Sequence, residues 1–256
     1  MKQFDPGEFY SRQLRMPEIG EKGQLKLLRS KVAVVGLGGL GTFECLLLAL
    51  AGVGEITVVD DDVVGVENLH RTPLYSLEDV GQPKVSVVKT KLEKLNTHLK
   101  VITLRERILE GLLERTLGNI DCIVDGLDNF ETRKAVNKYS VERRIPYIYS
   151  GVQAFDGNVS VFDPPETACL ECIMPDLSCG ALDFLPACSA LGVIGVSVGT
   201  VASVASTECI KLLLGMNSQL RGKLLTIDLR RPDFSLIDIQ RRLDCPVCGQ
   251  KGTSVG

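Results

Sequence analysis

Apolar residues in this chain fall into two kinds of run, short continuous blocks rich in β-branched residues and longer stretches with helical spacing. The short blocks predict buried strands, and the periodic stretches predict helices that cover a sheet. The expected strands are 31–35, 55–60, 100–104, 121–125, 147–152, 157–162, 223–228 and 234–239. The expected helices are 39–51, one that opens after Pro83, 109–116 and 129–142, preceded by an amphipathic helical arm over 7–30.

Strands that alternate with helices predict a parallel sheet with helices on both faces. We therefore expect an α/β fold: a Rossmann-like, twisted, mostly parallel sheet with helices on both faces, completed by C-terminal antiparallel strands. Residues 1–256 are expected to form one domain. Its expected parts are a helical arm (1–30), a core (31–162), a crossing loop (163–188) and a C-terminal helix with strands and a cysteine-bearing tail (189–256).

Residues 187–207 carry no charge and are long enough to cross a bilayer. Glycine, serine and threonine make this stretch only mildly apolar, and Glu208 and Lys211 follow within the same helical run. We interpret it as a small-residue helix packed inside a core or a subunit interface, rather than as a membrane span.

Net charge, the N-terminal residues and the number of cysteines indicate the class of protein and its compartment. A net charge of −3 exerts no broad attraction on nucleic acid or an acidic membrane, so neither is expected as a partner. The first residues lack the apolar core of a signal peptide. Nine cysteines in an unsecreted chain should stay reduced, which leaves metal binding, catalysis or burial to account for them. A cytoplasmic protein is expected.

The segment GLGGLG follows the first predicted strand and opens the first core helix. Its glycines have the spacing of the dinucleotide fingerprint, and they aim a helix N-terminus at phosphate. These glycines are Gly36, Gly38, Gly39 and Gly41. Asp60 ends the next strand, where an acid hydrogen-bonds a ribose hydroxyl. The turn predicts that the core, residues 31–162, binds a nucleotide, and taken alone it points to NAD.

Polar residues on the neighbouring loops suit a triphosphate better than NAD. Displacement at one phosphorus of a triphosphate requires cations that neutralise the reacting centre and the leaving pyrophosphate. Arg71 can grip phosphate oxygens bidentately, and Lys84 supplies a point charge. Asp128 is placed to hold Mg²⁺, although it could instead, or also, be a helix N-cap. Gly36, Asp60, Asp125 and Asp128 all end strands and should converge at one edge of the sheet.

Two Cys-x-x-Cys pairs lie far apart in the chain, one in the crossing loop and one in the tail. Together they supply the four thiolates of a structural zinc site: Cys169, Cys172, Cys245 and Cys248. Four ligands leave no open position for water, so we expect a structural zinc knuckle that joins the zinc tail, within 189–256, to the crossing loop. The alternatives are two redox pairs or a coincidence.

These motifs together resemble the ThiF/MoeB/HesA family, which shares its adenylating domain with the ubiquitin-activating enzymes. The resemblance rests on GLGGLG, Asp60, NLHR (68–71), GQPK (81–84) and DGLDNFETR (125–133), in order and spacing, and runs from YSRQ (10–13) to the last cysteine pair. It implies a homodimer that uses ATP and Mg²⁺ to adenylate the C-terminal glycine of a ubiquitin-like protein. It also implies the same structural zinc.

The resemblance also implies individual roles. Gly39 would contact the nucleotide phosphates and Asp60 the ribose. Asn68, Arg71 and Lys84 would contact the polyphosphate, and Asp128, with Asn129 beside it, the magnesium. Arg12 resembles an arginine that reaches into the neighbouring subunit's site. His70 and Thr72 depart from the family's commoner NLNRQ or NLQRQ, which bears on the identity of the partner.

The other cysteines divide into one candidate nucleophile and several without an expected role. Cys188 resembles the cysteine that links to the activated partner in sulfur-transferring relatives, and a helix N-terminus would favour its thiolate. It could equally be a small buried residue at a helix start. Cys45, Cys122 and Cys209 read as core residues, and Cys179 has no assignment.

The resemblance implies adenylation of the C-terminal glycine carboxylate of a ThiS/MoaD-like sulfur carrier that ends in Gly-Gly. A separate sulfur donor would then form the thiocarboxylate, for thiamin, molybdopterin or thiolated-tRNA synthesis. The rivals are an adenylating enzyme for another carboxylate, like the tRNA threonylcarbamoyladenosine cyclase, an NAD-dependent oxidoreductase, and a non-catalytic zinc adaptor. The cysteine pairs argue against the cyclase, and the phosphate and metal residues argue against the other two.

Overall fold

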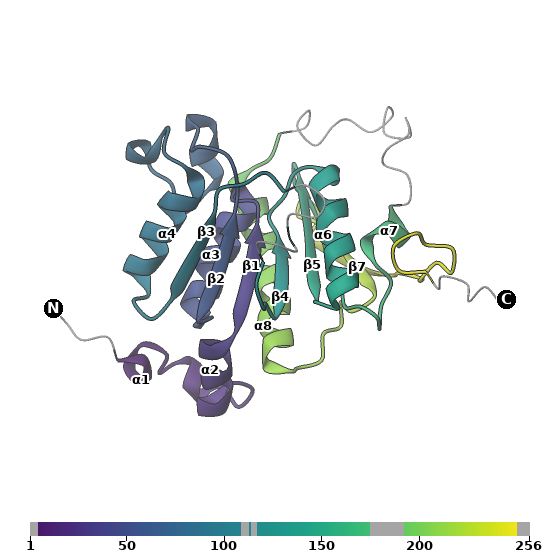
Figure 1. The fold of residues 1–256 in the computed structure, drawn as a ribbon, viewed down its shortest axis with the longest axis horizontal. Coiled ribbons are helices and arrows are strands. Elements are labelled where there is room, and N and C mark those ends of the chain that lie inside the picture. The colour runs from purple at the N-terminus through teal and green to yellow at the C-terminus, as the bar shows by residue number, and fades with distance from the viewer. Residues whose placement is uncertain (1–4, 109–112, 114–116, 175–191, 250–256) are drawn as a thin grey trace.

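The computed structural model describes residues 5–108, 113, 117–174 and 192–249 (Figure 1). An eight-stranded sheet has the order β3-β2-β1-β4-β5-β6-β7-β8. The first five strands run parallel: β1 Lys31–Val35, β2 Glu55–Val59, β3 Lys100–Leu104, β4 Cys122–Asp125 and β5 Tyr147–Gln153. The last three continue the sheet antiparallel: β6 Asp156–Phe162, β7 Lys223–Asp228 and β8 Asp233–Asp238.

Helices cover both faces of the sheet, as predicted. Alternate residues of β1 divide between two cores: Val32 and Val34 enter one, and Ala33 and Val35 enter the other. The first core lies under α3 (Gly39–Ala51), α4 (Lys84–Leu95) and α8 (Gly195–Leu214). The second lies under α6 (Phe130–Arg143). The mostly parallel sheet with C-terminal antiparallel strands is therefore confirmed.

The helix α8 is long and apolar enough to cross a membrane by length and composition alone, with 50% of its most apolar window buried inside the domain. It packs on α3, β5 and β6. Close approach requires small residues, since a Cβ at Gly157 of β6 would lie 2.3 Å from Cγ2 of Val201. The predicted core helix is thus present. It begins only at Gly195, well after the uncharged stretch starts.

The N-terminal arm is broken into α1 (Pro6–Phe9), the 3-10 turn η1 (Gln13–Arg15) and α2 (Gly20–Arg29). Figure 1 shows α1 and α2 at the end of the sheet where β1 begins. Nε2 of Gln13 donates to the carbonyl of Ala51, at the C-terminal end of α3, over 2.9 Å. The arm is therefore anchored away from the carboxyl ends of the parallel strands.

Three short helical segments lie in regions predicted as loops, η2 (Val66–Arg71), η3 (Leu77–Asp79) and α7 (Leu170–Ile173). Each spans six residues or fewer, which is too short to show a helical period. The helix predicted at 109–116 lies, except for residue 113, outside the described residues.

Candidate functional site

The glycine turn between β1 and α3 is packed so closely that side chains are excluded. Gly36 has φ +89°, and a Cβ there would lie 2.6 Å from the carbonyl oxygen of Gly126, which follows β4. A Cβ on Gly41 would lie 1.9 Å from the carbonyl oxygen of Gly36. Gly38, by contrast, precedes α3 and faces open space, because a Cβ there would meet nothing within 4 Å. The turn therefore exposes its backbone at the N-terminus of α3, a position suited to binding phosphate.

Asp60 is tied to this turn. Its Oδ2 accepts the backbone N–H of Leu37 at 2.7 Å, and its Oδ1 accepts the backbone N–H of Asp62 at 2.8 Å. Burial raises the pKa of Asp60 above its ordinary value, against the opposing effects of Lys84 and these two hydrogen bonds. The backbone N–H groups of Leu37 and Asp62 thus hold the Asp60 carboxylate beside the glycine turn.

Lys84 lies in the same place. It is buried at the start of α4, and its Nζ lies 2.8 Å from Oδ2 of Asp62 and 3.9 Å from Oδ1 of Asp60. Asp60, Asp61 and Asp62 bring carboxylate oxygens within 4.8 Å of one another, and Lys84 compensates part of that charge. The structure thus unites the predicted acid and the predicted lysine.

Arg71 ends η2 beside the start of α3. Its carbonyl oxygen would lie 3.4 Å from a Cβ on Gly39, and its Cα 3.4 Å from a Cβ on Gly195. Nη1 of Arg71 donates to the carbonyl of Glu67 at 2.5 Å and lies 3.0 Å from Nε2 of His70. The guanidinium is therefore folded back on its own loop, one residue from the departure at position 70.

Asn68 is buried within the same 3-10 segment. Its Oδ1 accepts the backbone N–H of Gly65 at 2.9 Å, and its backbone carbonyl accepts from Oγ1 of Thr72. This side chain shapes the loop that carries Arg71, whatever else it contacts.

The turn after β4 shows which residue caps the N-terminus of α6. The N-cap of α6 is Asn129, whose Oδ1 accepts the backbone N–H of Thr132 at 2.9 Å. The interpretation of Asp128 as the cap is therefore wrong, because the neighbouring residue already fills that position. Asp128 is exposed beside the cap and makes no hydrogen bond or ion pair to another described residue.

Asp125 does not join the others with its side chain, contrary to the expectation that it should. Its Oδ2 accepts from Nε of Arg133 at 2.9 Å and from the hydroxyl of Tyr147 at 2.5 Å, on the α6 face of the sheet. Nη2 of Arg133 also donates to the carbonyls of Leu127 and Ser150. Burial opposes the charge of Arg133, but the Asp125 carboxylate raises its pKa above the ordinary value. The sequence reasoning missed this buried pair, for which an arginine eight residues after a strand-ending acid was the available signal.

Glu44, on α3, is a buried acid that the sequence reasoning also missed. The Ser150 hydroxyl lies 2.6 Å from the carbonyl oxygen of Asp125 and 3.1 Å from Oε1 of Glu44. A hydroxyl has one proton to donate, and the carbonyl can only accept. Glu44 must then be protonated and donate to Ser150. Burial, and next the nearby Asp125, raise the pKa of Glu44 well above its ordinary value.

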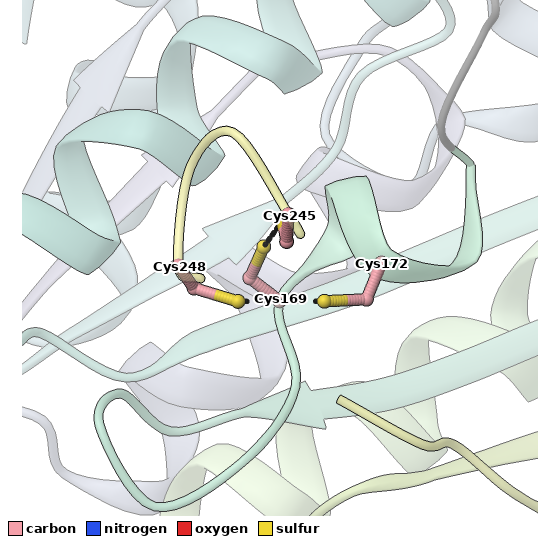
Figure 2. Close-up of side chains that lie close together, drawn as sticks. All are labelled: Cys169, Cys172, Cys245 and Cys248. Atoms are coloured by element: carbon pink, nitrogen blue, oxygen red, sulfur yellow. Dashed lines mark hydrogen bonds between the residues drawn. The ribbon is translucent and has the colours of Figure 1, made fainter. Parts of the chain in front are cut away.

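The four predicted zinc ligands meet between α7 and the tail loop (Figure 2). Cys169 and Cys172 flank and enter α7, and Cys245 and Cys248 lie in the tail loop. The Sγ atoms are 3.7 Å apart for Cys169 and Cys245 and 3.4 Å apart for Cys172 and Cys248. All four lie within 4.8 Å of one another and are buried.

This geometry fits a tetrahedral metal. Four sulfurs about 2.3 Å from a zinc ion lie about 3.8 Å from one another, close to the observed separations. Burial raises the pKa of the Cys169 thiol, whereas at Cys245 burial is outweighed by the backbone N–H groups of Cys248 and Val247, which lower the pKa to about 7. Gly249 is required by the tail turn, since a Cβ there would lie 2.4 Å from the carbonyl oxygen of Cys245. The donor set and the turn therefore suit zinc.

Arg12 lies far from the glycine turn of its own chain. It is exposed at the start of η1, next to Gln13, which is bonded to the C-terminal end of α3. The glycine turn is at the other end of this 13-residue helix, about 20 Å away. That distance exceeds the reach of an arginine side chain.

The five cysteines outside the cluster divide into three that the structure describes and two that it does not. Cys45, Cys122 and Cys209 are buried, as expected of core residues. Cys179 and Cys188 lie outside the described residues. The described part of α8 begins at Gly195, so the expectation that a helix N-terminus favours the Cys188 thiolate also lies outside the described residues.

Comparison with known proteins gives consistent results. The model of the ThiF family matches residues 10–247. The chain is 38% identical to a sulfur carrier protein adenylyltransferase of Thermus thermophilus, over 95% of this chain and 91% of that protein. It is 36% identical to the sulfur carrier protein ThiS adenylyltransferase of Escherichia coli, over 94% of each. A crystal structure of Escherichia coli MccB with ATP superposes with a TM-score of 0.78 at 27% identity, covering 88% of this chain and 68% of that one.

Proposed function

Since this chain belongs to the ThiF family, we propose that it adenylates the C-terminal carboxylate of a ubiquitin-like sulfur-carrier protein. The observation that carries this proposal is the meeting of Asp60 and Lys84 beside the glycine turn. That arrangement offers a ribose ligand, a phosphate cradle and a buried cation within one small region. The two sulfur-carrier adenylyltransferases that resemble this chain over nearly its whole length support the carrier as substrate.

In the reaction, a carboxylate oxygen of the carrier's last residue attacks the α-phosphorus of ATP. The bond to the bridging oxygen breaks, pyrophosphate leaves, and an acyl-adenylate remains. No general base is needed, because a C-terminal carboxylate is ionised at neutral pH. The protein contributes position and charge: Lys84 and Arg71 oppose the negative charge that develops on the phosphates.

The backbone at Gly38 and Gly39 receives the phosphates at the N-terminus of α3, and Gly36 and Gly41 let the turn close. Arg71 must leave the carbonyl of Glu67 to reach them. Asn68 holds the loop from which Arg71 extends.

Asp128, with Asn129 beside it, is the proposed magnesium ligand. Its exposed carboxylate, which has no partner among the described residues, suits a hard divalent cation. When bound, Mg²⁺ would neutralise charge on the polyphosphate oxygens.

The proposed assembly is a homodimer. Arg12 lies too far from its own glycine turn to contact a bound phosphate, so a second copy of the chain would supply it. The family match over 10–247 also supports a single adenylating domain.

Zinc is proposed to join the tail to the crossing loop through Cys169, Cys172, Cys245 and Cys248. A separate sulfur donor would convert the acyl-adenylate to a thiocarboxylate. Cys188 stays a candidate for a covalent link to the carrier, to be tested by replacing it and measuring thiocarboxylate formation and exchange separately.

The experiment that tests the function is ATP–pyrophosphate exchange with each ubiquitin-like carrier from the same genome. One carrier that ends in Gly-Gly should stimulate exchange strongly. The matched control is the same carrier without its final glycine, which should not. If no such carrier stimulates exchange, the sulfur-carrier substrate is wrong, and exchange with another carboxylate would identify the substrate class instead.

A further inference from the structure

Tyr75 is a buried residue of the segment that joins η2, which ends in Arg71, to α4, which begins at Lys84. Its ring belongs to the core under α3, and its hydroxyl donates to the backbone carbonyl of Leu37 over 2.8 Å. Leu37 lies in the glycine turn and is itself fully buried. One side chain therefore connects the segment between the two proposed phosphate-binding cations to the turn that is proposed to receive the phosphates.

The Leu37 backbone is held on both sides. Its carbonyl can only accept, so the Tyr75 hydroxyl must be the donor. Burial, and next the charge of Asp60, raise the pKa of Tyr75 above its ordinary value, which keeps this hydroxyl protonated. The N–H of Leu37 donates in turn to Oδ2 of Asp60 at 2.7 Å. Both polar groups of the Leu37 backbone are thus bound by side chains from outside the glycine turn.

The hydrogen bond from Tyr75 also sets the direction of the next backbone N–H. The carbonyl of Leu37 and the N–H of Gly38 belong to one planar trans peptide group, in which they point in opposite directions. The carbonyl points to buried Tyr75, so the Gly38 N–H points away from it. Gly38 is the N-cap of α3, and its N–H makes no hydrogen bond to another residue in the described part of the chain. This N–H is therefore free to donate to a ligand.

We propose that Tyr75 is a positioning residue of the nucleotide site, which fixes the peptide between Leu37 and Gly38 so that the Gly38 N–H donates to a phosphate oxygen. The inference rests on the proposed binding of ATP at the glycine turn. Tyr75 acts through this peptide and needs no contact with the nucleotide. A donor that is already aimed at its acceptor does not have to be ordered when the ligand binds, which strengthens binding.

The direct test removes only the hydroxyl. Tyr75→Phe keeps the ring in the core and leaves the Leu37 carbonyl without its donor, so the peptide loses its fixed direction. ATP should bind about 10-fold more weakly, because a hydrogen bond to a charged group contributes about that much or more. Adenosine, which lacks phosphate, should bind as it does to the native protein. Calorimetry measures the affinity for ATP, and a ligand-observed NMR titration measures that for adenosine.

Tyr139→Phe is the matched control. Tyr139 is also a buried tyrosine whose hydroxyl donates to a backbone carbonyl, that of Leu117, over 3.3 Å, but it belongs to the core under α6. Loss of this hydroxyl should leave the affinity for ATP unchanged. Equal losses of ATP affinity in the two variants, or equal losses for ATP and adenosine in Tyr75→Phe, would reduce Tyr75 to a general effect on the fold and overturn the proposal. Unchanged ATP affinity in Tyr75→Phe would overturn it as well.

A second measurement follows the Gly38 N–H itself. In the full-length native protein, the amide proton resonance of Gly38, assigned through the backbone, should move downfield when ATP saturates the site, as expected for a new hydrogen bond to a phosphate oxygen. The same shift should be smaller in Tyr75→Phe at saturation. If Tyr75→Phe does not fold, the native spectrum decides alone, and a Gly38 resonance that ATP leaves in place overturns the proposal. A native protein that does not bind ATP overturns both this inference and the proposed function, whereas ATP binding that is independent of Tyr75 overturns this inference only.

Discussion

Asp60 and Leu37 are joined between neighbouring strands, because Oδ2 of Asp60 accepts the Leu37 N–H at 2.7 Å. The proposed ribose ligand thus also shapes the proposed phosphate-binding turn. Asp60→Asn keeps one acceptor and puts an amide where the other was. It should raise the KM for ATP in the exchange assay about 10- to 100-fold, since hydrogen bonds to charged groups contribute about 1.5–3 kcal/mol. Asp61→Asn, at the exposed neighbour, is the control, and equal effects in both variants would contradict the assignment.

Lys84 should act on the reaction step more than on ATP binding. It is buried beside Asp60 and Asp62, so its charge is screened little by solvent. Lys84→Ala should lower kcat for exchange about 100- to 1000-fold, as loss of a transition-state donor does in other enzymes. Lys89→Ala changes a solvent-facing lysine of the same helix and should leave kcat intact. Full exchange in Lys84→Ala would remove this residue from the site.

Arg12 should act on the partner's site. Arg12→Ala and Lys84→Ala homodimers should each be nearly inactive. Mixing them, with subunit exchange, should restore about a quarter of native activity, because half of the sites in half of the dimers then hold both residues. Action of Arg12 within its own chain predicts no recovery. The measurement is ATP–pyrophosphate exchange activity as a function of the mixing ratio. The Arg12→Ala, Lys84→Ala double variant serves as the inactive control in the mixtures.

Glu44 should make the fold less stable as pH rises. The folded protein keeps the Glu44 proton, whose pKa is well above its ordinary value, whereas the unfolded chain releases it above about pH 4.3. The folded state then binds more protons, so the contribution falls with pH by up to about 1.4 kcal/mol per unit. Glu44→Gln lacks this term and can still donate to Ser150. The free energy of unfolding in urea, taken as the value for Glu44→Gln minus the value for the native protein, should rise from pH 5 to pH 8. If this difference stays constant with pH, Glu44 is ionised in the folded protein.

Removing zinc should destabilise the tail and spare the nucleotide site. Cys248→Ser leaves three thiols in the buried cluster and should reduce bound zinc and the melting temperature. A chelator should lower the melting temperature of native protein but not that of the variant. The KM for ATP should change little, because the cluster contacts the C-terminal half of α6, at Asn137 and Val141, and not its N-cap Asn129. A large increase in that KM would show that the metal supports nucleotide binding directly.

The sheet could be predicted because its central strands are continuous runs of apolar, β-branched residues. β1, β2 and β4 are central, and their buried runs of valine and isoleucine leave no competing helical period. The glycine turn and Asp60 could be placed for a similar reason, since a strand end and a fixed turn determine both. The contact between Lys84 and Asp62 could not, because it depends on how η2 and η3 fold between two distant segments.

The directions of the polar side chains around the site could not be predicted from the sequence. Asp125 is level with Val59 in the sheet, one residue before the position of Asp60, so the alternation of side chains turns it to the α6 face, where Arg133 and the hydroxyl of Tyr147 bind it. Asn129 rather than Asp128 caps α6, a choice that local composition leaves open since either residue can cap a helix. Buried Glu44 has no sequence signal, because a single acid in an apolar helix does not reveal which partner on β5 will meet it.

The packing of α8 also bears on how this chain is made. Its partners α3, β5 and β6 all precede it in sequence, so during synthesis their residues leave the ribosome first. When the apolar helix emerges, the surface that will cover it has already been made, and domains fold as units during such vectorial synthesis. A segment long enough for a bilayer thus meets its binding surface in its own nascent chain at once, which shortens the time in which a membrane could compete for it.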